Sequence, residues 1–238
     1  MSQVAHHMQD APVLSAGFYG KHPAFGDFVT AGLSQPLADH LEGWLNTMLP
    51  DLRDGVADAW EAHYDAAPQM RIWIGPGLTP EGRGFCGTMT ATRDKVGRRF
   101  PLLAGVEGAA IAAPSIDPGQ AYYDRIDSFL ATYERGSEDA RGMAAVFAAE
   151  MLPNVDSAEP LPATDFWAAR QDGDVTRLWS DVAEADRARA CAMRTYLWRA
   201  SSEAAALYVT DGLPGAAVFA WMMGAEYTPP VRPERGQP

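Results

Sequence analysis

The chain is poor in cysteine and in basic residues. Its 238 residues include two cysteines, Cys86 and Cys191, and 19 lysines and arginines against 31 aspartates and glutamates. Isolated cysteines in apolar surroundings are typical of buried free thiols, so we expect no disulfide framework and a reducing compartment. The formal net charge of -12 disfavours nucleic acid and anionic lipid as general partners, because both are negatively charged.

Long apolar runs are missing as well. Residues 1–12 have neither the basic start nor the apolar middle of a signal peptide. The longest apolar stretch, residues 212–224, is too short to cross a bilayer and is typical of a buried helix. We therefore expect no integral membrane segment and a cytoplasmic location.

The usual catalytic, metal and nucleotide motifs are absent from the sequence. There is no G-x-S-x-G, and the five histidines (His6, His7, His22, His40 and His63) form neither H-x-x-x-H nor H-E-x-x-H. Residues 75–80 imitate a dinucleotide fingerprint, but Pro80 stands at its third glycine, and residues 77–83 lack the Lys-Ser/Thr pair of a P-loop. We interpret this region as a hairpin loop, and we expect no catalytic residue, cofactor or metal.

Hydrophobic periodicity predicts strands and helices between two tails. Apolar residues at three- and four-residue steps predict helices over 37–49, 122–133 and 143–151, the first opened by Pro36. Shorter helices are expected around Phe166 and Leu178, and a final helix opened by Pro214 should pack Val218, Phe219 and Trp221. Strands are predicted at 70–74, 85–92, 100–106, 192–198 and 205–210, with a surface connection at 156–162.

This order of elements predicts a central sheet flanked by helices. No stretch in the middle of the chain has the composition of a linker, so we expect one domain over residues 13–227. Residues 1–12 and the proline-rich residues 228–238 are expected to be disordered tails.

The segment 17–28, GFYGKHPAFGDF, is the most informative part of the chain, and its residues 20–28, GKHPAFGDF, are the most unusual. Its glycines permit backbone conformations that other residues resist, and its proline restrains the residue before it. Lys21 and Asp27 are close enough on a folded-back loop to pair. Phe25 and Phe28 could anchor the loop. Two interpretations stay open. One is a rigid loop pinned to the core, and the other is a docking surface that presents Lys21, Phe25 and Asp27. The residues singled out here are Gly20, Lys21, Pro23, Phe25, Gly26, Asp27 and Phe28.

A second segment, DKVGRRFPL at residues 94–102, is the densest basic cluster of this acidic chain. An exposed arginine fork there could bind a carboxylate or a phosphate. Alternatively, the chain turns at Gly97, Asp94 pairs with one arginine, and the segment leads into the strand at Phe100. The sequence does not separate the two. The residues of interest are Asp94, Gly97, Arg98, Arg99 and Pro101.

Three blocks resemble the TagF/ImpM family of proteins associated with the bacterial type VI secretion system. Residues 17–28 resemble its G-x-x-G-K-x-P-x-x-G-D-F opening, and residues 94–102 resemble its D-x-V-G-R-x-F-P-L block. Its C-terminal block, L-W followed by G-L-P and a closing helix, resembles Leu197-Trp198 with Asp211, Gly212, Leu213 and Pro214 through Phe219. The chain departs from the family pattern at His22, where an apolar residue is expected, and at Arg199, where a second tryptophan is common.

The resemblance implies a three-layer α/β sandwich, in which a central mixed sheet carries helices on both faces, as a single TagF-like domain. It also implies a cytoplasmic, non-enzymatic regulator that represses assembly of the secretion machine after translation. Type VI secretion components are the implied partners, among them an Fha-type scaffold protein. The residues themselves leave an alternative open, a small-anion sensor or enzyme that uses Lys21, Asp27, Arg98 and Arg99. That alternative requires the first two blocks to meet in space.

Overall fold

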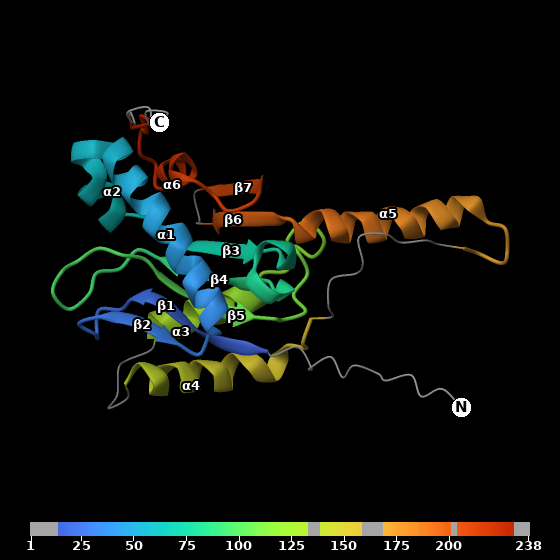
Figure 1. Ribbon diagram of the computed structural model, residues 1–238, viewed down its shortest axis with the longest axis horizontal. Coiled ribbons are helices and arrows are strands. Elements are labelled where there is room, and N and C mark those ends of the chain that lie inside the picture. The colour runs from blue at the N-terminus through green and yellow to red at the C-terminus, as the bar shows by residue number, and fades with distance from the viewer. Residues whose placement is uncertain (1–13, 133–138, 159–168, 201–203, 231–238) are drawn as a thin grey trace, which may run out of the picture.

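A single seven-stranded sheet organises the fold (Figure 1). The computed structural model describes residues 14–132, 139–158, 169–200 and 204–230. The strand order is β2-β1-β5-β4-β3-β6-β7, and every neighbouring pair is antiparallel. The strands are β1 (Ser15–Lys21), β2 (Phe28–Ala31), β3 (Met70–Ile74), β4 (Phe85–Thr90), β5 (Leu102–Glu107), β6 (Arg194–Ala200) and β7 (Ala205–Asp211).

Helices cover both faces of this sheet, which confirms the three-layer α/β sandwich (Figure 1). Leu41 and Leu45 of α1 and Phe219 of α6 belong to the core on one face, and Ile126 of α3 and Phe147 of α4 to the core on the other. The helices are α1 (Gln35–Val56), α2 (Trp60–Asp65), α3 (Ala121–Thr132), α4 (Ala140–Met151), α5 (Val175–Ala192) and α6 (Ala216–Met222).

The sheet is antiparallel throughout, where a mixed sheet was expected. Each of the pairs β1–β2, β3–β4, β4–β5 and β6–β7 joins strands that follow one another in the chain, and such hairpin connections give antiparallel neighbours. The remaining pairs join distant strands, β1 with β5 and β3 with β6, and their direction depends on tertiary packing.

The expected helix over 37–49 lies within α1, whose start follows from local chemistry. Ser34 caps the helix, because its Oγ accepts a hydrogen bond from Leu37 N at 3.3 Å, and a proline occupies the first turn. The hairpin loop predicted after β3 is confirmed, because Ile74 pairs with Phe85 across it. Both cysteines are buried free thiols, as expected.

Three expectations differ from the structure. The loop expected over residues 20–28 is shorter in the structure, because Gly20 and Lys21 lie in β1 and Phe28 begins β2, so residues 22–27 connect the two strands of a β-hairpin. The short helix expected near Leu178 is the 18-residue α5, which extends away from the sheet (Figure 1). Trp221 was expected to pack in the core, but it is 52% exposed, because α6 turns other residues toward α1.

Some predicted features lie outside the described residues. These are Tyr133, the short helix around Phe166, the tail 1–12 and most of the tail 228–238. Thr228 is described, and its N–H donates to Gly55 O at 3.0 Å. Within the described ranges, none of the helices combines the length and the apolar character needed to cross a membrane.

Candidate functional site

The first two motif segments meet at a buried ion pair. Lys21 ends β1, and Asp94 lies in the connection between β4 and β5. Lys21 Nζ donates to Asp94 Oδ2 at 2.9 Å, and the two side chains are 6% and 0% exposed. The ammonium also lies 5.1 Å from the centre of the Phe28 ring. Segments that are far apart in sequence are therefore tied together at one point.

Asp94 is surrounded by hydrogen-bond donors. Its Oδ1 accepts from the backbone N–H of Val96 at 3.0 Å and of Arg98 at 2.8 Å, and its Oδ2 also accepts from Arg98 Nε at 2.6 Å. Burial alone would raise the pKa of the Asp94 carboxyl, but the bonds from Lys21, Arg98 and the backbone outweigh it and hold the pKa well below its usual range. Asp94 is therefore ionised at neutral pH.

The turn that presents Asp94 has the predicted form. Gly97 has a φ of 88°, a left-handed conformation that favours glycine, and its N–H donates to Asp94 O at 2.9 Å. One arginine, Arg98, pairs with Asp94, as the structural interpretation expects. The same arginine reaches the first segment, because its Nη2 donates to Gly26 O at 3.0 Å. A backbone bond from Lys95 N to Phe25 O, at 3.1 Å, closes the junction.

The pairing predicted between Lys21 and Asp27 is replaced by the pair with Asp94. Asp27 Oδ1 instead accepts from the backbone N–H of Phe28 at 2.8 Å. The reason is the hairpin, in which Lys21 pairs with Phe28 in the strand register and faces the turn between β4 and β5.

Arg99 belongs to a second cluster, on α2. Its Nη2 lies 2.8 Å from Asp65 Oδ2 and its Nη1 lies 2.9 Å from Glu61 Oε1, and Arg93 contacts Asp65 as well. Hydrogen bonds from Arg99 and then from Arg93 lower the pKa of the Asp65 carboxyl. The four residues of the anion-binding alternative therefore do not converge on one point.

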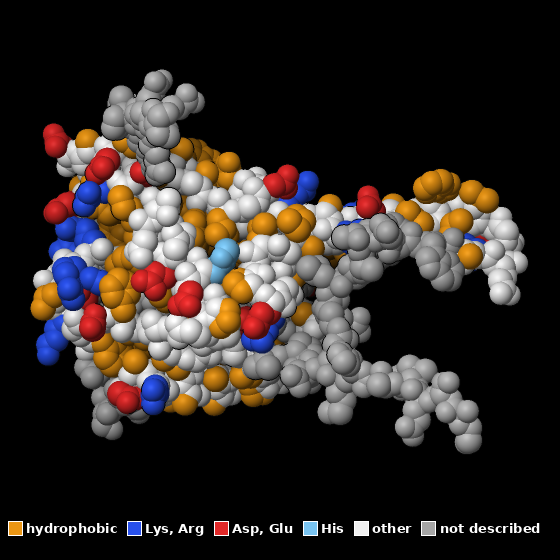
Figure 2. Space-filling view, viewed as in Figure 1, with side chains coloured by type: hydrophobic (Ala, Val, Ile, Leu, Met, Phe, Trp, Pro, Cys, Tyr) orange, Lys and Arg blue, Asp and Glu red, His pale blue; other side chains and the backbone are white. Residues whose placement is uncertain are grey.

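The surface of the junction differs from the one expected. Lys21 is 5% exposed, so it is not presented to a partner, whereas Phe28 is 45% and Val96 is 69% exposed. Figure 2 shows basic side chains gathered at the end of the molecule where the connection between β4 and β5 lies in Figure 1. The exposure of Val96 was not predicted from the sequence, because valine is typical of strands, whereas this one lies on an exposed turn.

The third block lies toward the opposite edge of the sheet and also has structural contacts. Trp198 Nε1 donates to Gln120 Oε1 at 2.9 Å, and its ring packs edge-on against Tyr123, with 4.7 Å between ring centroids. Gln120 Oε1 also accepts from Arg71 Nη1 at 2.8 Å. Pro214 O accepts from Trp44 Nε1 at 2.9 Å. The block thus fastens α3 to the sheet and the loop after β7 to α1.

Sequence reasoning also missed Glu107, a buried acid at the end of β5. Its Oε2 accepts from Ser15 Oγ at 3.0 Å and from Ser34 N at 3.0 Å, and Arg83 Nη1 lies 3.5 Å from its Oε1. A single acid at the end of the apolar run LLAGVE was the available signal.

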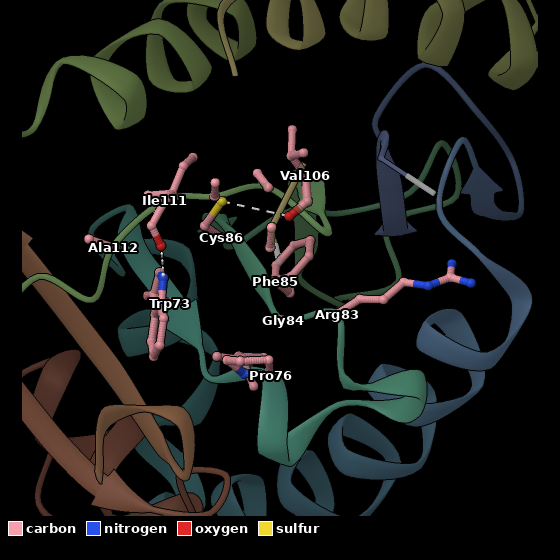
Figure 3. A pocket seen from close by; sticks show the side chains of 13 residues that line it. Trp73, Pro76, Arg83, Gly84, Phe85, Cys86, Val106, Ile111 and Ala112 are labelled. Atoms are coloured by element: carbon pink, nitrogen blue, oxygen red, sulfur yellow. Dashed lines mark hydrogen bonds between the residues drawn. The ribbon is translucent and has the colours of Figure 1, made fainter. Parts of the chain in front are cut away.

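An apolar cavity of about 260 Å³ adjoins β3 and β4 (Figure 3). Trp73 Nε1 donates to Ile111 O across it at 2.9 Å, and the charged end of Arg83 points away from it. Burial raises the pKa of Cys86 in its wall to about 12, so the thiol is protonated and unreactive near neutral pH. Among the residues that the structure describes, no three His, Cys, Asp or Glu side chains are grouped to hold a metal ion.

The fold and the junction define a three-layer α/β domain in which the distinctive charged residues tie the sheet edge to a neighbouring turn. The family described as "TagF N-terminal domain, Type VI secretion system-associated" matches residues 17–148. The chain belongs to this family and is a type VI secretion-associated accessory protein.

A solved structure supports the assignment. The crystal structure of PA0076 from Pseudomonas aeruginosa PAO1 resembles this chain with a TM-score of 0.67 and 25% sequence identity, over 95% of this chain and 100% of that one. No curated protein sequence is significantly similar to the chain.

Proposed function

We propose that this protein represses assembly of the type VI secretion machine after translation, and that it acts by binding a component of the machine or an Fha-type scaffold protein. The proposal is supported by one observation on a chain of a secretion-associated family. Charged side chains of its first two motif segments are paired with each other. Lys21 and Arg98 converge on Asp94, so these charges are paired within the fold, and contacts with a partner fall to the exposed surface.

The alternative, a small-anion sensor or enzyme, gains little from this geometry. An anion at the junction would have to compete with the Asp94 carboxylate for both cations, and Asp94 stays ionised because its pKa is lowered. Arg99 is held by two acids on α2. We therefore propose a binding role without catalysis.

We further propose that residues 13–227 form one domain located in the cytoplasm. Strands from both halves of the chain share the sheet, since β6 lies directly beside β3. Two buried free thiols suit a reducing compartment.

Secretion assays test the regulatory role. In the bacterium that carries this gene and the secretion cluster, deletion should raise effector secretion, and overexpression should suppress it. Total effector and transcript levels should stay constant, since the proposed action follows translation. Unchanged secretion in both strains would refute the proposal.

Charge reversal at Arg98 separates a contact from a structural role. If Arg98→Glu loses partner binding while its melting temperature stays at the wild-type value, the exposed part of Arg98 makes a contact. If the variant unfolds, Arg98 acts mainly as a tie to Asp94. Titration with inorganic phosphate tests the alternative, because a saturable rise in melting temperature that Arg98→Glu abolishes would favour an anion site.

A further inference from the structure

An open groove of about 550 Å³ lies between α1 and the loop that leads from β7 into α6. Four α1 residues at four-residue spacing form one wall, so they lie along a single stripe of the helix. They are Asp39, Gly43, Thr47 and Asp51, and they face Leu213 and Pro214. The bond from Trp44 Nε1 to Pro214 O, at 2.9 Å, fixes the two walls relative to each other.

One glycine of this groove is not required by the fold. Gly43 lies in the interior of the 22-residue α1, where glycine is less favourable than alanine, and a Cβ built on it would meet nothing within 4 Å. Neither steric contact nor a left-handed backbone explains Gly43. Gly215 in the opposite wall is the N-cap of α6, a position that favours glycine, and a Cβ on it would also meet nothing within 4 Å. The space that both glycines leave open belongs to the groove.

The groove carries negative charge. Asp39 and Asp51 stand toward the two ends of the stripe, and the described residues that line the groove include no lysine or arginine. His40 lines it too, and the shielded Nε2 atom of this histidine has no hydrogen-bond partner among the described residues. Because this atom is shielded, it is not a contact point for a ligand, and the two carboxylates are the feature that a ligand would recognise. The negative charge of these carboxylates favours a cationic group on the ligand.

We propose that this groove docks a segment of a partner protein that carries lysine or arginine beside small or apolar residues. The proposal rests on the proposed function, in which the chain acts through protein contacts. The cation pairs with Asp39 or Asp51, its aliphatic stem lies against Leu213 and Pro214, and the partner backbone passes over Gly43.

The length of the stripe sets the spacing of the partner's charges. Asp39 and Asp51 are twelve residues apart on α1, or about 18 Å at 1.5 Å per residue. An extended segment that pairs with both would carry its basic residues about five positions apart.

Gly43→Ala is the informative variant, because its effects on stability and on binding should have opposite signs. Alanine should raise the melting temperature by favouring the helix, while its methyl group fills the groove and lowers partner binding at least tenfold. Asn46→Ala is the matched control, since Asn46 is exposed on the same helix and does not line the groove. It should keep full binding. Asp39→Asn combined with Asp51→Asn should fold and lose binding.

Binding is read in cells that contain the whole secretion cluster, with a photo-crosslinking amino acid in place of Thr47 in the full chain. A cross-linked segment that carries lysine or arginine, with a yield that falls at least tenfold in Gly43→Ala, supports the proposal. An uncharged or acidic segment, a second copy of this chain, no product, or full yield in Gly43→Ala overturns it. Effector secretion under wild-type overexpression reads the proposed function separately, so the two can fail independently.

Discussion

Lys21 and Asp94 are 73 residues apart in sequence, and their side chains form a buried ion pair with an Nζ–Oδ2 distance of 2.9 Å. Lys21 has an aromatic face beside it, and Asp94 has Arg98 as a second partner. The pair therefore links two segments of the fold. We expect removal of one of its side chains to lower the stability of the protein directly, and to affect partner binding only through that loss.

Replacing Lys21 by methionine tests this tie. Lys21→Met keeps the length of the side chain and leaves Asp94 with Arg98 and two backbone donors, so we expect a loss of about 2 kcal/mol in the free energy of unfolding. Urea denaturation measures the loss. Lys95→Met is the control, because Lys95 is exposed on the same turn, and it should change stability by less than about 0.5 kcal/mol. Equal midpoints for Lys21→Met and wild type would contradict the expectation.

The acid limb of the stability curve should depend on Asp65 and Asp94. The pKa of each carboxyl is lowered in the folded state, below an ordinary value of about 3.9. The stability that these groups contribute is therefore complete above about pH 5 and is lost as the pH falls through 4 toward the folded-state pKa. Unfolding measured from pH 7 to pH 3 should show this fall.

Asp65→Asn gives the matched comparison. The variant should be less stable than wild type at pH 7, and the difference should shrink below pH 4, where Asp65 of the unfolded wild-type chain binds a proton while folded Asp65 is still ionised. Asp58→Asn on the exposed surface is the control. A constant difference between Asp65→Asn and wild type across this range would show that the ion pairs with Arg93 and Arg99 do not cause the acid dependence.

The two glycines of the GKHPAFGD segment should respond very differently to alanine. Gly20 has a φ of 130°, and a Cβ on it would lie 1.9 Å from Pro101 O. Gly20→Ala should destabilise the protein by about 3 kcal/mol or more, since a strained backbone and a clash with main chain add up. Gly26→Ala should be within about 0.5 kcal/mol of wild type, because its Cβ would meet nothing within 4 Å. Similar thermal stability for the two variants would argue against the close β1–β5 approach.

Both thiols should be protected in the native protein. Cys86 and Cys191 are buried, and burial raises the pKa of Cys86 to about 12. A thiol reagent at pH 8 should therefore label native protein far more slowly than protein unfolded in urea. Fast labelling of Cys86 in the native state would show that the wall of the apolar cavity opens readily.

Much of the fold could be predicted from the sequence, because buried helices and strands leave a strong pattern. The stripe from Leu37 to Leu49 and the alternation around Ile72 both correspond to elements of the core. Exposed helices and strands leave a weaker hydrophobic pattern in the sequence. The apolar spacing of α5 stops after Val182, while its alanine- and arginine-rich remainder continues as helix to Ala192, so the pattern predicted a shorter helix.

The first strand was missed for a different reason. Gly17 and Gly20 weaken a strand prediction, yet they allow the backbones to pack closely, since a Cβ on Gly17 would lie 2.1 Å from Ala31 O. The pairing of Lys21 with Asp94 depends on β5 lying beside β1, and strand order is a property of the packed sheet. The Asp94–Arg98 turn is local, and it could be predicted.

The strand order also bears on how the protein is made. The β1–β2 hairpin stands at the sheet edge and borders β5, so its neighbour and the partner of Lys21 are synthesised well after it. At about 5–20 residues per second, Asp94 follows Lys21 by roughly 4–15 s. During that interval β1 can pair only with β2, and Lys21 lacks its partner Asp94. A two-stranded hairpin alone is at best marginally stable in water. We therefore expect the N-terminal motif to complete its folding only after the β5 region has been translated, and long-range pairing of this kind slows folding.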